Sequence, residues 1–405
     1  MTTSANETGN LVSSFTKAPP IEPRLFSTDK PPSLKDFKTL TTESRLIDYP
    51  LASSIIKNVP IYDLSAFSSY TPEQLFALQD EWYHILLRGP GVFATKHMYT
   101  DTYLLDNVND IFSRIISQEA QQSSKKGDHF ATSGSNSRIW NSFSKHCLKD
   151  APSFIEYYSN PWLSLISSAW LGPHHRLTAQ VNVVRPGGAA QISHRDYHLG
   201  FQSASACAQF PRATQAASQF LTLQGAVAHS DMPLASGPTR LLPFSQRFEE
   251  GYMAYRLKEF QDYFLEAYVS VPLAKGDGLF FNPALFHAAG ENTSADIQRS
   301  ANLLQISSAF GKAMESIDTL PLVEKTWDLL VQRYSDQGLS ESIKTFIGNV
   351  AEGYPFPTNL DNRVPETAGM APESEQDLLV KGLREGWGKG RVLSELKGMR
   401  EQGFA

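Results

Sequence analysis

Apolar residues recur three or four positions apart after Pro72, and this spacing predicts an amphipathic helix. The recurring residues are Leu75, Leu78, Trp82, Ile85 and Leu86. Thr71 is a suitable N-cap, Pro72 fits the first helical position, and Gln74 completes a capping box. The run Arg88-Gly-Pro-Gly91 should end this helix, and Val92-Phe-Ala-Thr95 is expected to follow as a short strand.

The same spacing predicts helices before and after the middle of the chain. We expect helices over Asp101–Gln118 and Ala151–Trp170, and a helical segment after Lys312. A last amphipathic segment covers Ser374–Arg400. It is interrupted by Gly382, Gly386, Gly388 and Gly390. Since glycine disfavours the helix interior, the pattern there predicts a helix less strongly.

Apolar and polar residues alternate with a period of two over Arg176–Val184, which is typical of a half-buried strand. Further strands are expected at Gln219–Val227, Tyr268–Pro272, Gly278–Phe281 and Ser300–Ala309. Several short strands without helical crossovers favour an antiparallel barrel or jelly roll over a parallel sheet. The predicted fold class is therefore mainly β with flanking helices.

These patterns divide the chain into three parts. Residues 1–47 are rich in Ser, Thr, Pro and Lys, and we expect an extended or partly disordered arm there. Residues 48–312 hold the first helices and all predicted strands. Residues 313–405 should form a helical extension packed on that core. The polar segment 128–137 is expected to be a loop, either a lid over a pocket or a simple connection.

Charge and composition narrow the classes of function. A net charge of −6 without a run of lysines or arginines argues against nucleic-acid and anionic-membrane partners. Two cysteines, Cys147 and Cys207, are too few for a disulfide framework or a cysteine-rich zinc site. No targeting or membrane-spanning segment is visible. We therefore expect a soluble, cytoplasmic protein; a homodimer is a further hypothesis.

His194-Arg-Asp196 is the first candidate for metal chemistry. On a strand, residues i and i+2 point to the same face, so an imidazole and a carboxylate can converge on one ion. This mixed donor pair suits Fe(II) better than structural zinc, whose sites favour thiolates. The alternative is a histidine paired with Asp196 or with a backbone group. His229-Ser-Asp231 is a rival pair of the same spacing.

Two later residues strengthen the prediction that His194 and Asp196 bind a metal. His287 follows a short buried strand, Gly278–Phe281, where a barrel would present it at its mouth. With His194 and Asp196 it would complete the 2-His-1-carboxylate set of non-heme iron oxygenases. Arg299 opens the strand expected after it, and a carboxylate ligand would give its guanidinium a bidentate partner. The alternative for this arginine is a salt bridge to Glu291 or Asp296.

Together these stretches resemble the phytanoyl-CoA dioxygenase family of Fe(II)/2-oxoglutarate-dependent oxygenases over roughly residues 60–312. His194-Arg-Asp196-Tyr-His198 resembles its His-x-Asp box, and Gly237-Pro-Thr-Arg-Leu-Leu-Pro-Phe-Ser245, preceded by Ala228-His-Ser-Asp231, its central strand-loop-strand. His287-x-x-Gly-x-Asn-Thr-Ser294 resembles the distal histidine box, and Arg299 has the place of the 2-oxoglutarate arginine.

The resemblance implies a double-stranded β-helix that holds Fe(II) through His194, Asp196 and His287, with 2-oxoglutarate and O2 as co-substrates. It places the distal carboxylate of 2-oxoglutarate on Arg299, with Thr239 and Gln191 as further candidates. Because the carboxylate is present where halogenating relatives have a small residue, oxygenation is the expected reaction. Hydroxylation comes first, with desaturation or cyclisation as alternatives, on a secondary metabolite or an amino-acid or fatty-acid derivative.

The sequence departs from the family at a turn and within the His-x-Asp box. Pro243-Phe-Ser-Gln246 replaces the usual Pro-Gly-Ser-His, and we expect the lost imidazole to affect the choice of substrate. Arg195 should point away from the ligand face, and the family pattern gives it no role. We expect His198 to contact the metal ligands, to contact the substrate or to be a structural residue, and His174-His175 to be a solvated loop pair.

Two other functions are compatible with the residues. A non-catalytic jelly-roll protein could bind a small molecule at the same mouth. A cupin-type enzyme could use the metal without 2-oxoglutarate. Arg299 distinguishes these alternatives from a 2-oxoglutarate-dependent enzyme, because an arginine without an acidic protein neighbour favours the binding of 2-oxoglutarate.

Overall fold

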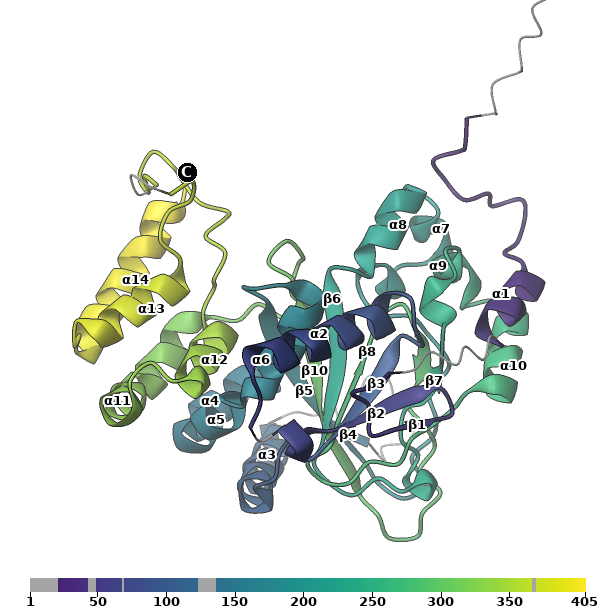
Figure 1. The fold of residues 1–405 in the computed structure, drawn as a ribbon, viewed down its shortest axis with the longest axis horizontal. Coiled ribbons are helices and arrows are strands. Elements are labelled where there is room, and N and C mark those ends of the chain that lie inside the picture. The colour runs from purple at the N-terminus through teal and green to yellow at the C-terminus, as the bar shows by residue number, and fades with distance from the viewer. Residues whose placement is uncertain (1–20, 43–48, 68, 123–135, 366–368) are drawn as a thin grey trace, which may run out of the picture.

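A large mixed sheet forms the centre of the molecule in a computed structural model that describes residues 21–42, 49–67, 69–122, 136–365 and 369–405 (Figure 1). Its strand order is β1-β2-β3-β8-β6-β10-β5-β4. The bounds are β1 (Ser54–Ile56), β2 (Val59–Asp63), β3 (Val92–Lys96), β4 (Asn136–Ile139), β5 (Arg176–Val184), β6 (Thr222–Ala228), β8 (Gly278–Phe281) and β10 (Arg299–Ser307). The pair β2–β3 is parallel, and the other pairings are antiparallel.

A second sheet has two strands, β7 (Arg240–Leu242) and β9 (Phe286–Ala288). The sheets do not close into one barrel, but side chains of both line a common cavity. The strand expected at Tyr268–Pro272 is wrong, since only an isolated bridge joins Val269 to Leu241 there. The other predicted strands are confirmed within a few residues, and β5 and β8 have the predicted bounds.

Helices cover the sheet and extend the fold on the left and on the right of the view in Figure 1. They are α1 (Leu34–Thr41), α2 (Pro72–Leu87), α3 (Thr102–Gln122), α4 (Ser142–Lys149), α5 (Ala151–Tyr158), α6 (Pro161–Leu171), α7 (Ala204–Cys207), α8 (Arg212–Ser218), α9 (Gly251–Ala254), α10 (Lys258–Ala267), α11 (Thr319–Gln337), α12 (Glu341–Val350), α13 (Glu375–Arg384) and α14 (Lys389–Gly403). Short 3-10 turns lie at Leu64–Phe67, His198–Phe201, Leu234–Ser236 and Ser245–Arg247. Among the described residues, no helix is both long enough and apolar enough to span a membrane.

Local chemistry explains where the predicted helices begin and break. The capping box of Thr71 and Gln74 is present at the start of α2. The helix expected over 151–170 is two helices, because Asn160 caps a new helix whose first residue is Pro161. The segment 374–400 likewise divides, because Gly386 adopts a φ of +66° between α13 and α14.

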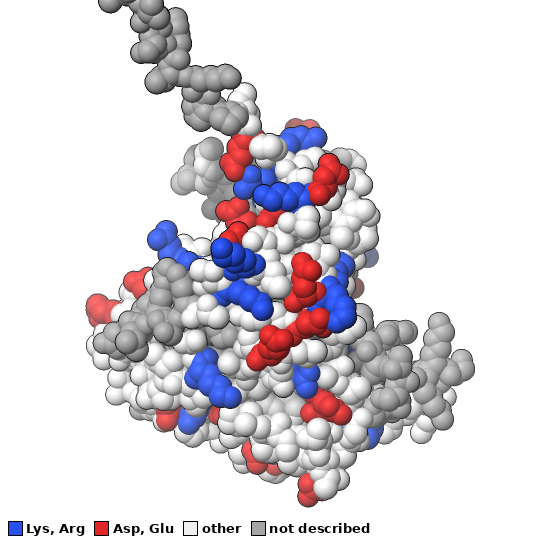
Figure 2. All heavy atoms as spheres, turned by 90° about the vertical axis from the view of Figure 1, so that its right-hand side faces the viewer, with Lys and Arg blue, Asp and Glu red and all other residues white. Residues whose placement is uncertain are grey.

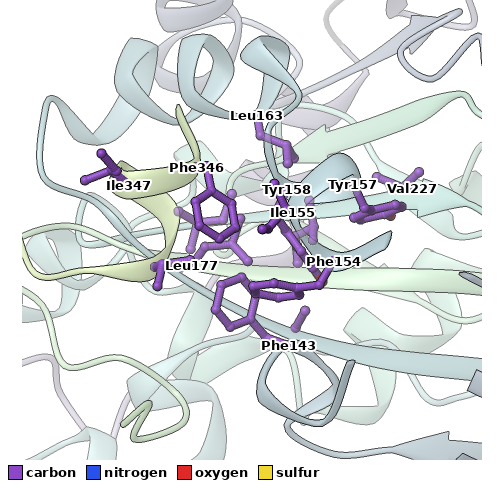
Figure 3. Close-up of a cluster of buried hydrophobic side chains, with 14 of the residues drawn as sticks. Phe143, Phe154, Ile155, Tyr157, Tyr158, Leu163, Leu177, Val227, Phe346 and Ile347 are labelled. Carbon is purple, nitrogen blue, oxygen red and sulfur yellow. The ribbon is translucent and has the colours of Figure 1, made fainter. Parts of the chain in front are cut away.

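The main core lies between the sheet and the helices on one side of it. Figure 3 shows side chains of α4, α5, α6 and α12 meeting those of β5 and β6. Phe143, Phe154 and Phe346 are among its fully or almost fully buried rings. This packing anchors one face of β5 and β6. Their other face is left to line the cavity.

A smaller core anchors part of the segment expected to be an extended arm. Ser33 caps α1, and Phe37 is completely buried against Phe248, Phe260 and Phe286. The expectation of extended chain is therefore wrong for α1, because Phe37 fixes the helix to the fold. Residues 1–20 of the arm lie outside the described residues, as does most of the loop expected at 128–137.

Candidate metal centre

His194, Asp196 and His287 come together in the structure. One ligand atom from each lies within 4.8 Å of the other two. The Nε2 atoms of His194 and His287 are 3.9 and 3.7 Å from the same oxygen, Asp196 Oδ2. One imidazole is almost fully buried and the other is partly exposed, so the cluster has an open side.

Backbone pairing places the two histidines side by side. The N–H of His194 donates to the carbonyl of His287 at 2.9 Å, and the N–H of His287 donates back at 3.1 Å. The pair is an isolated bridge at the middle residue of β9, so the expectation of a strand for the His-x-Asp segment is wrong: it belongs to no strand. Residues about ninety positions apart are thereby fixed in one register.

Each imidazole is oriented by a carbonyl two residues before it. His194 Nδ1 is 2.8 Å from the carbonyl of Ile192, and His287 Nδ1 is 2.8 Å from that of Leu285. A carbonyl can only accept, so both Nδ1 atoms carry the proton. Both Nε2 atoms face Asp196, which is the orientation that metal-binding histidines have.

Asp196 is held as a carboxylate by its neighbours. Gln224 Nε2 donates to Asp196 Oδ2 at 2.7 Å. Burial alone would raise the pKa of Asp196, but His194, His287 and the Gln224 amide together lower it well below its usual range. Burial and the nearby His287 lower the pKa of His194. The cluster therefore offers one anionic oxygen and neutral imidazole nitrogen, which are donors suited to Fe(II).

Arg195 points away from this cluster, as expected, and is anchored elsewhere. Its guanidinium is buried and donates to the carbonyls of Ser245 and Phe248 at 2.7 and 2.8 Å. It lies over the rings of Tyr252 and Phe286. No signal in the sequence identified this contact, because the partners are backbone carbonyls fifty residues away.

The cluster opens into a cavity of about 530 Å³. Leu279, Phe281 and Leu303 supply part of an apolar wall, and the remaining polar lining consists largely of carboxamides. Thr239 and Gln191, the further candidates for 2-oxoglutarate, also line it. The side-chain oxygen of Gln191 already has a hydrogen-bond partner, because Oε1 accepts from the N–H of Ala289 at 3.2 Å. The cavity thus brings every predicted site residue to one space.

Arg299 lines the same cavity and is buried without a carboxylate partner among the described residues. Glu291 and Asp296, the predicted alternatives, form no ion pair with it. Its Nη1 reaches the carbonyl of Gly290 only at 3.4 Å. Burial lowers the pKa of Arg299 to about 10, so the group stays charged at neutral pH. A buried cation of this kind requires an anion.

The other candidate histidines lie outside the cluster. His229 is buried between Tyr157 and Asn109, and burial lowers its pKa to about 3, so it serves the core and not a metal. His198 reaches the carbonyl of Lys312 at 3.2 Å. The expectation of a solvated His174-His175 pair is wrong for His175, which is 5% exposed.

Gln246 also differs from expectation. Its buried Nε2 donates to the carbonyl of Gly89 at 2.9 Å, and the side chain is not part of the cavity wall. The replacement of the family's histidine therefore does not act through contact with the cavity. Gln224 and Gln305, by contrast, were missed. They stand on predicted strands, where a single glutamine gives no signal until the register of its neighbours is known.

Comparison with known families identifies the chain. The profile of the phytanoyl-CoA dioxygenase (PhyH) family matches residues 67–301, more than half of the sequence. The chain belongs to this family. It is accordingly a non-heme oxygenase that uses Fe(II), 2-oxoglutarate and O2, and its two sheets with a shared cavity are the family's double-stranded β-helix. A search of curated proteins finds no match.

Solved structures give weaker similarities. The α-ketoglutarate-dependent carbocyclase SnoK from nogalamycin biosynthesis is 18% identical, with a TM-score of 0.42, over 60% of this chain and 85% of its own. The epimerase SnoN from the same biosynthesis is 16% identical, with a TM-score of 0.40, over 57% and 83%.

Proposed function

We propose that His194, Asp196 and His287 hold the iron of this oxygenase, and that Arg299 binds the distal carboxylate of 2-oxoglutarate. Thr239 and Gln191 are the further contacts proposed for the co-substrate. The reaction is the oxidation of an unactivated C–H bond in a small organic substrate, with hydroxylation as the expected outcome and desaturation or cyclisation as variants. The bound iron and 2-oxoglutarate supply the oxidising chemistry.

The residues fit this metal. Two oriented imidazoles and one ionised carboxylate are the donor types of non-heme iron oxygenases, and together they would hold the ion while leaving room for 2-oxoglutarate. Gln224 holds the carboxylate by one oxygen, which keeps its orientation fixed before the ion arrives. The open side of the cluster faces the cavity, where co-substrate and substrate would enter.

The single observation that carries the proposal is the state of Arg299. It is a buried guanidinium without an acidic partner among the described residues, in the same cavity as the triad. Its planar fork suits a carboxylate in a bidentate pair. A cupin-type metal enzyme without 2-oxoglutarate would leave this charge unexplained, so the structure favours the 2-oxoglutarate enzyme.

The apolar wall completes the roles of the protein. Leu279, Phe281 and Leu303 give the cavity an apolar wall, which would exclude bulk water from around a bound carboxylate. The exclusion strengthens the ion pair between Arg299 and a bound carboxylate. Without bulk water in this space, a substrate bound beside the metal would be the group available for oxidation.

The experiment is a titration of 2-oxoglutarate into the anaerobic Fe(II) protein, read by calorimetry. We expect saturable binding by the wild type and at least a hundredfold loss in Arg299→Leu, because a charge-assisted bidentate pair is removed. Arg114→Leu, on the exposed surface of α3, is the matched control. Unchanged binding in Arg299→Leu would overturn the assignment of this residue.

Three further proposals concern the whole chain. We propose that 48–312 is the oxygenase domain and 313–405 its helical extension, with 1–47 as an N-terminal arm. Cytoplasmic location and the absence of nucleic-acid partners are proposed from composition; basic and acidic side chains lie interspersed on the face in Figure 2. A homodimer is a hypothesis that light scattering would test.

A further inference from the structure

Two glutamines face each other across neighbouring strands at the cavity wall. Gln305 of β10 stands directly opposite Gln224 of β6 in the antiparallel register, and both side chains line the cavity. Asn182, on β5, lines the same wall. Directly opposed residues of an antiparallel pair lie close enough for their side chains to act on one ligand.

The orientation of the Gln224 amide is fixed by its partner. Since Asp196 is a carboxylate and can only accept, Gln224 must turn its Nε2 toward it. Gln224 Oε1 therefore points elsewhere, and it is buried without a donor among the described residues. Gln305 Oε1 and Asn182 Oδ1 are likewise buried and have no donor among the described residues. Buried acceptors without donors are costly, and a small rotation of these cavity-lining side chains would bring their oxygens to a donor on a ligand or an ordered water.

2-Oxoglutarate cannot satisfy these oxygens. At neutral pH its two carboxylates and keto group only accept hydrogen bonds. The carboxamide oxygens therefore belong to the part of the cavity left for the substrate.

The charges of the cavity wall define what that substrate carries. Asp196 is the one acidic side chain among the described lining residues, and the metal occupies it in the proposed enzyme. No acid remains to pair with a cationic substrate. Arg138 already donates to Gln180 Oε1 at 3.0 Å and lies over the ring of Trp140. A neutral substrate fits this wall best.

Apolar surface surrounds the polar group. Trp140, Phe201 and Met314 line the cavity together with Gln305. Ile192, also in the lining, is 71% exposed, so the apolar surface continues to the cavity opening. A ligand with a sizeable apolar body can therefore enter with its polar group foremost.

We propose that the substrate is a neutral, largely apolar molecule that donates a hydroxyl or N–H hydrogen bond to the paired oxygens of Gln224 and Gln305, which orient it beside the metal. This inference rests on the proposed function, because the substrate part is defined by what iron and 2-oxoglutarate leave free. It assigns Gln305 as a residue that determines specificity.

The test uses matched fragment pairs that differ in one donor. Naphthols, indanols and other fused-ring alcohols are compared with their methyl ethers, and primary amides with their N,N-dimethyl forms, by ligand-observed NMR. The protein is full-length and carries no added metal, so binding is read apart from turnover. We expect alcohols or amides with a free donor to bind about tenfold more tightly than their methylated partners.

Variants assign that preference to the carboxamide wall. Gln305→Met, close to glutamine in shape, should reduce the preference to about onefold while leaving the affinity of the ethers unchanged. Gln209→Met, on the exposed surface, should keep the wild-type preference. If Gln305→Met does not fold, the comparison of alcohols with ethers on the wild type still decides whether a donor is required.

Several results would overturn the inference: equal binding of alcohols and ethers, no alcohol or amide bound at millimolar concentration, preference for carboxylates or amines, or an unchanged preference in Gln305→Met. Titration of 2-oxoglutarate with Fe(II) on the same samples separates the two proposals. Loss of that binding with the donor preference intact would refute the proposed function and leave the substrate-orienting wall standing.

Discussion

The guanidinium of Arg195 donates to the carbonyl of Ser245 at 2.7 Å, and this contact links the two halves of the metal centre. Ser245 is completely buried, and its hydroxyl oxygen accepts from the N–H of Phe286 at 2.8 Å. Arg195 follows one proposed ligand in the chain, and Phe286 precedes another. One serine thus fixes the segments of both histidines.

Arg195→Met tests this link. The variant keeps much of the apolar stem but removes both hydrogen bonds to Ser245 and Phe248, so the His-x-Asp segment should lose its fixed position. We expect a 10- to 100-fold loss of affinity for Mn(II), about the effect of losing an outer contact of a metal ligand. Arg114→Met, on the exposed face of α3, is the control, and equal affinity in the two variants would contradict the role.

Phe37→Ala tests whether α1 is part of the fold. The ring is completely buried against Phe248, Phe260 and Phe286, so its removal should lower the free energy of unfolding by about 3–5 kcal/mol. Urea unfolding measures the change. Phe76→Ala, where the side chain is 66% exposed, should cost much less, and equal costs would show that α1 does not anchor the arm.

Stability should fall as the pH drops below about 6.5. Burial lowers the pKa of His146 and His175 to about 4 and that of His229 to about 3. Between these values and 6.5 the unfolded chain binds protons that the folded chain does not, so acid favours unfolding. Each histidine contributes a slope of up to about 1.4 kcal/mol per pH unit.

Urea unfolding at pH 7, 6 and 5 measures this slope. The loss should be small from pH 7 to 6 and larger from 6 to 5, because the unfolded imidazoles titrate near 6.5. Stability that stays constant between pH 7 and 5 would show that these three histidines are not buried in the neutral form.

The sequence predicted the local elements wherever one signal sufficed. Thr71 and Gln74 predicted the start of α2, and the alternation over 176–184 predicted β5 with its bounds. The triad and Arg299 could be named because ligand chemistry restricts the residue types. Asn160-Pro161 also carried a signal for the break between α5 and α6, but the continuous apolar pattern concealed it.

What the sequence could not predict depends on contacts between distant segments. Arg195 finds its partners in carbonyls, which every residue carries, so no spacing identifies them. Gln224 and Gln305 gain their meaning from a register that places them opposite each other. The burial of Phe37 likewise depends on rings more than two hundred residues away.

The most direct test of the account is the binding of Fe(II) by anaerobic equilibrium dialysis. We predict one iron per chain for the wild type and for His198→Ala, whose side chain faces the carbonyl of Lys312 and not the cluster. His194→Ala and His287→Ala should retain the fold by circular dichroism and lose the iron. Wild-type iron content in either variant would contradict the assignment of the triad.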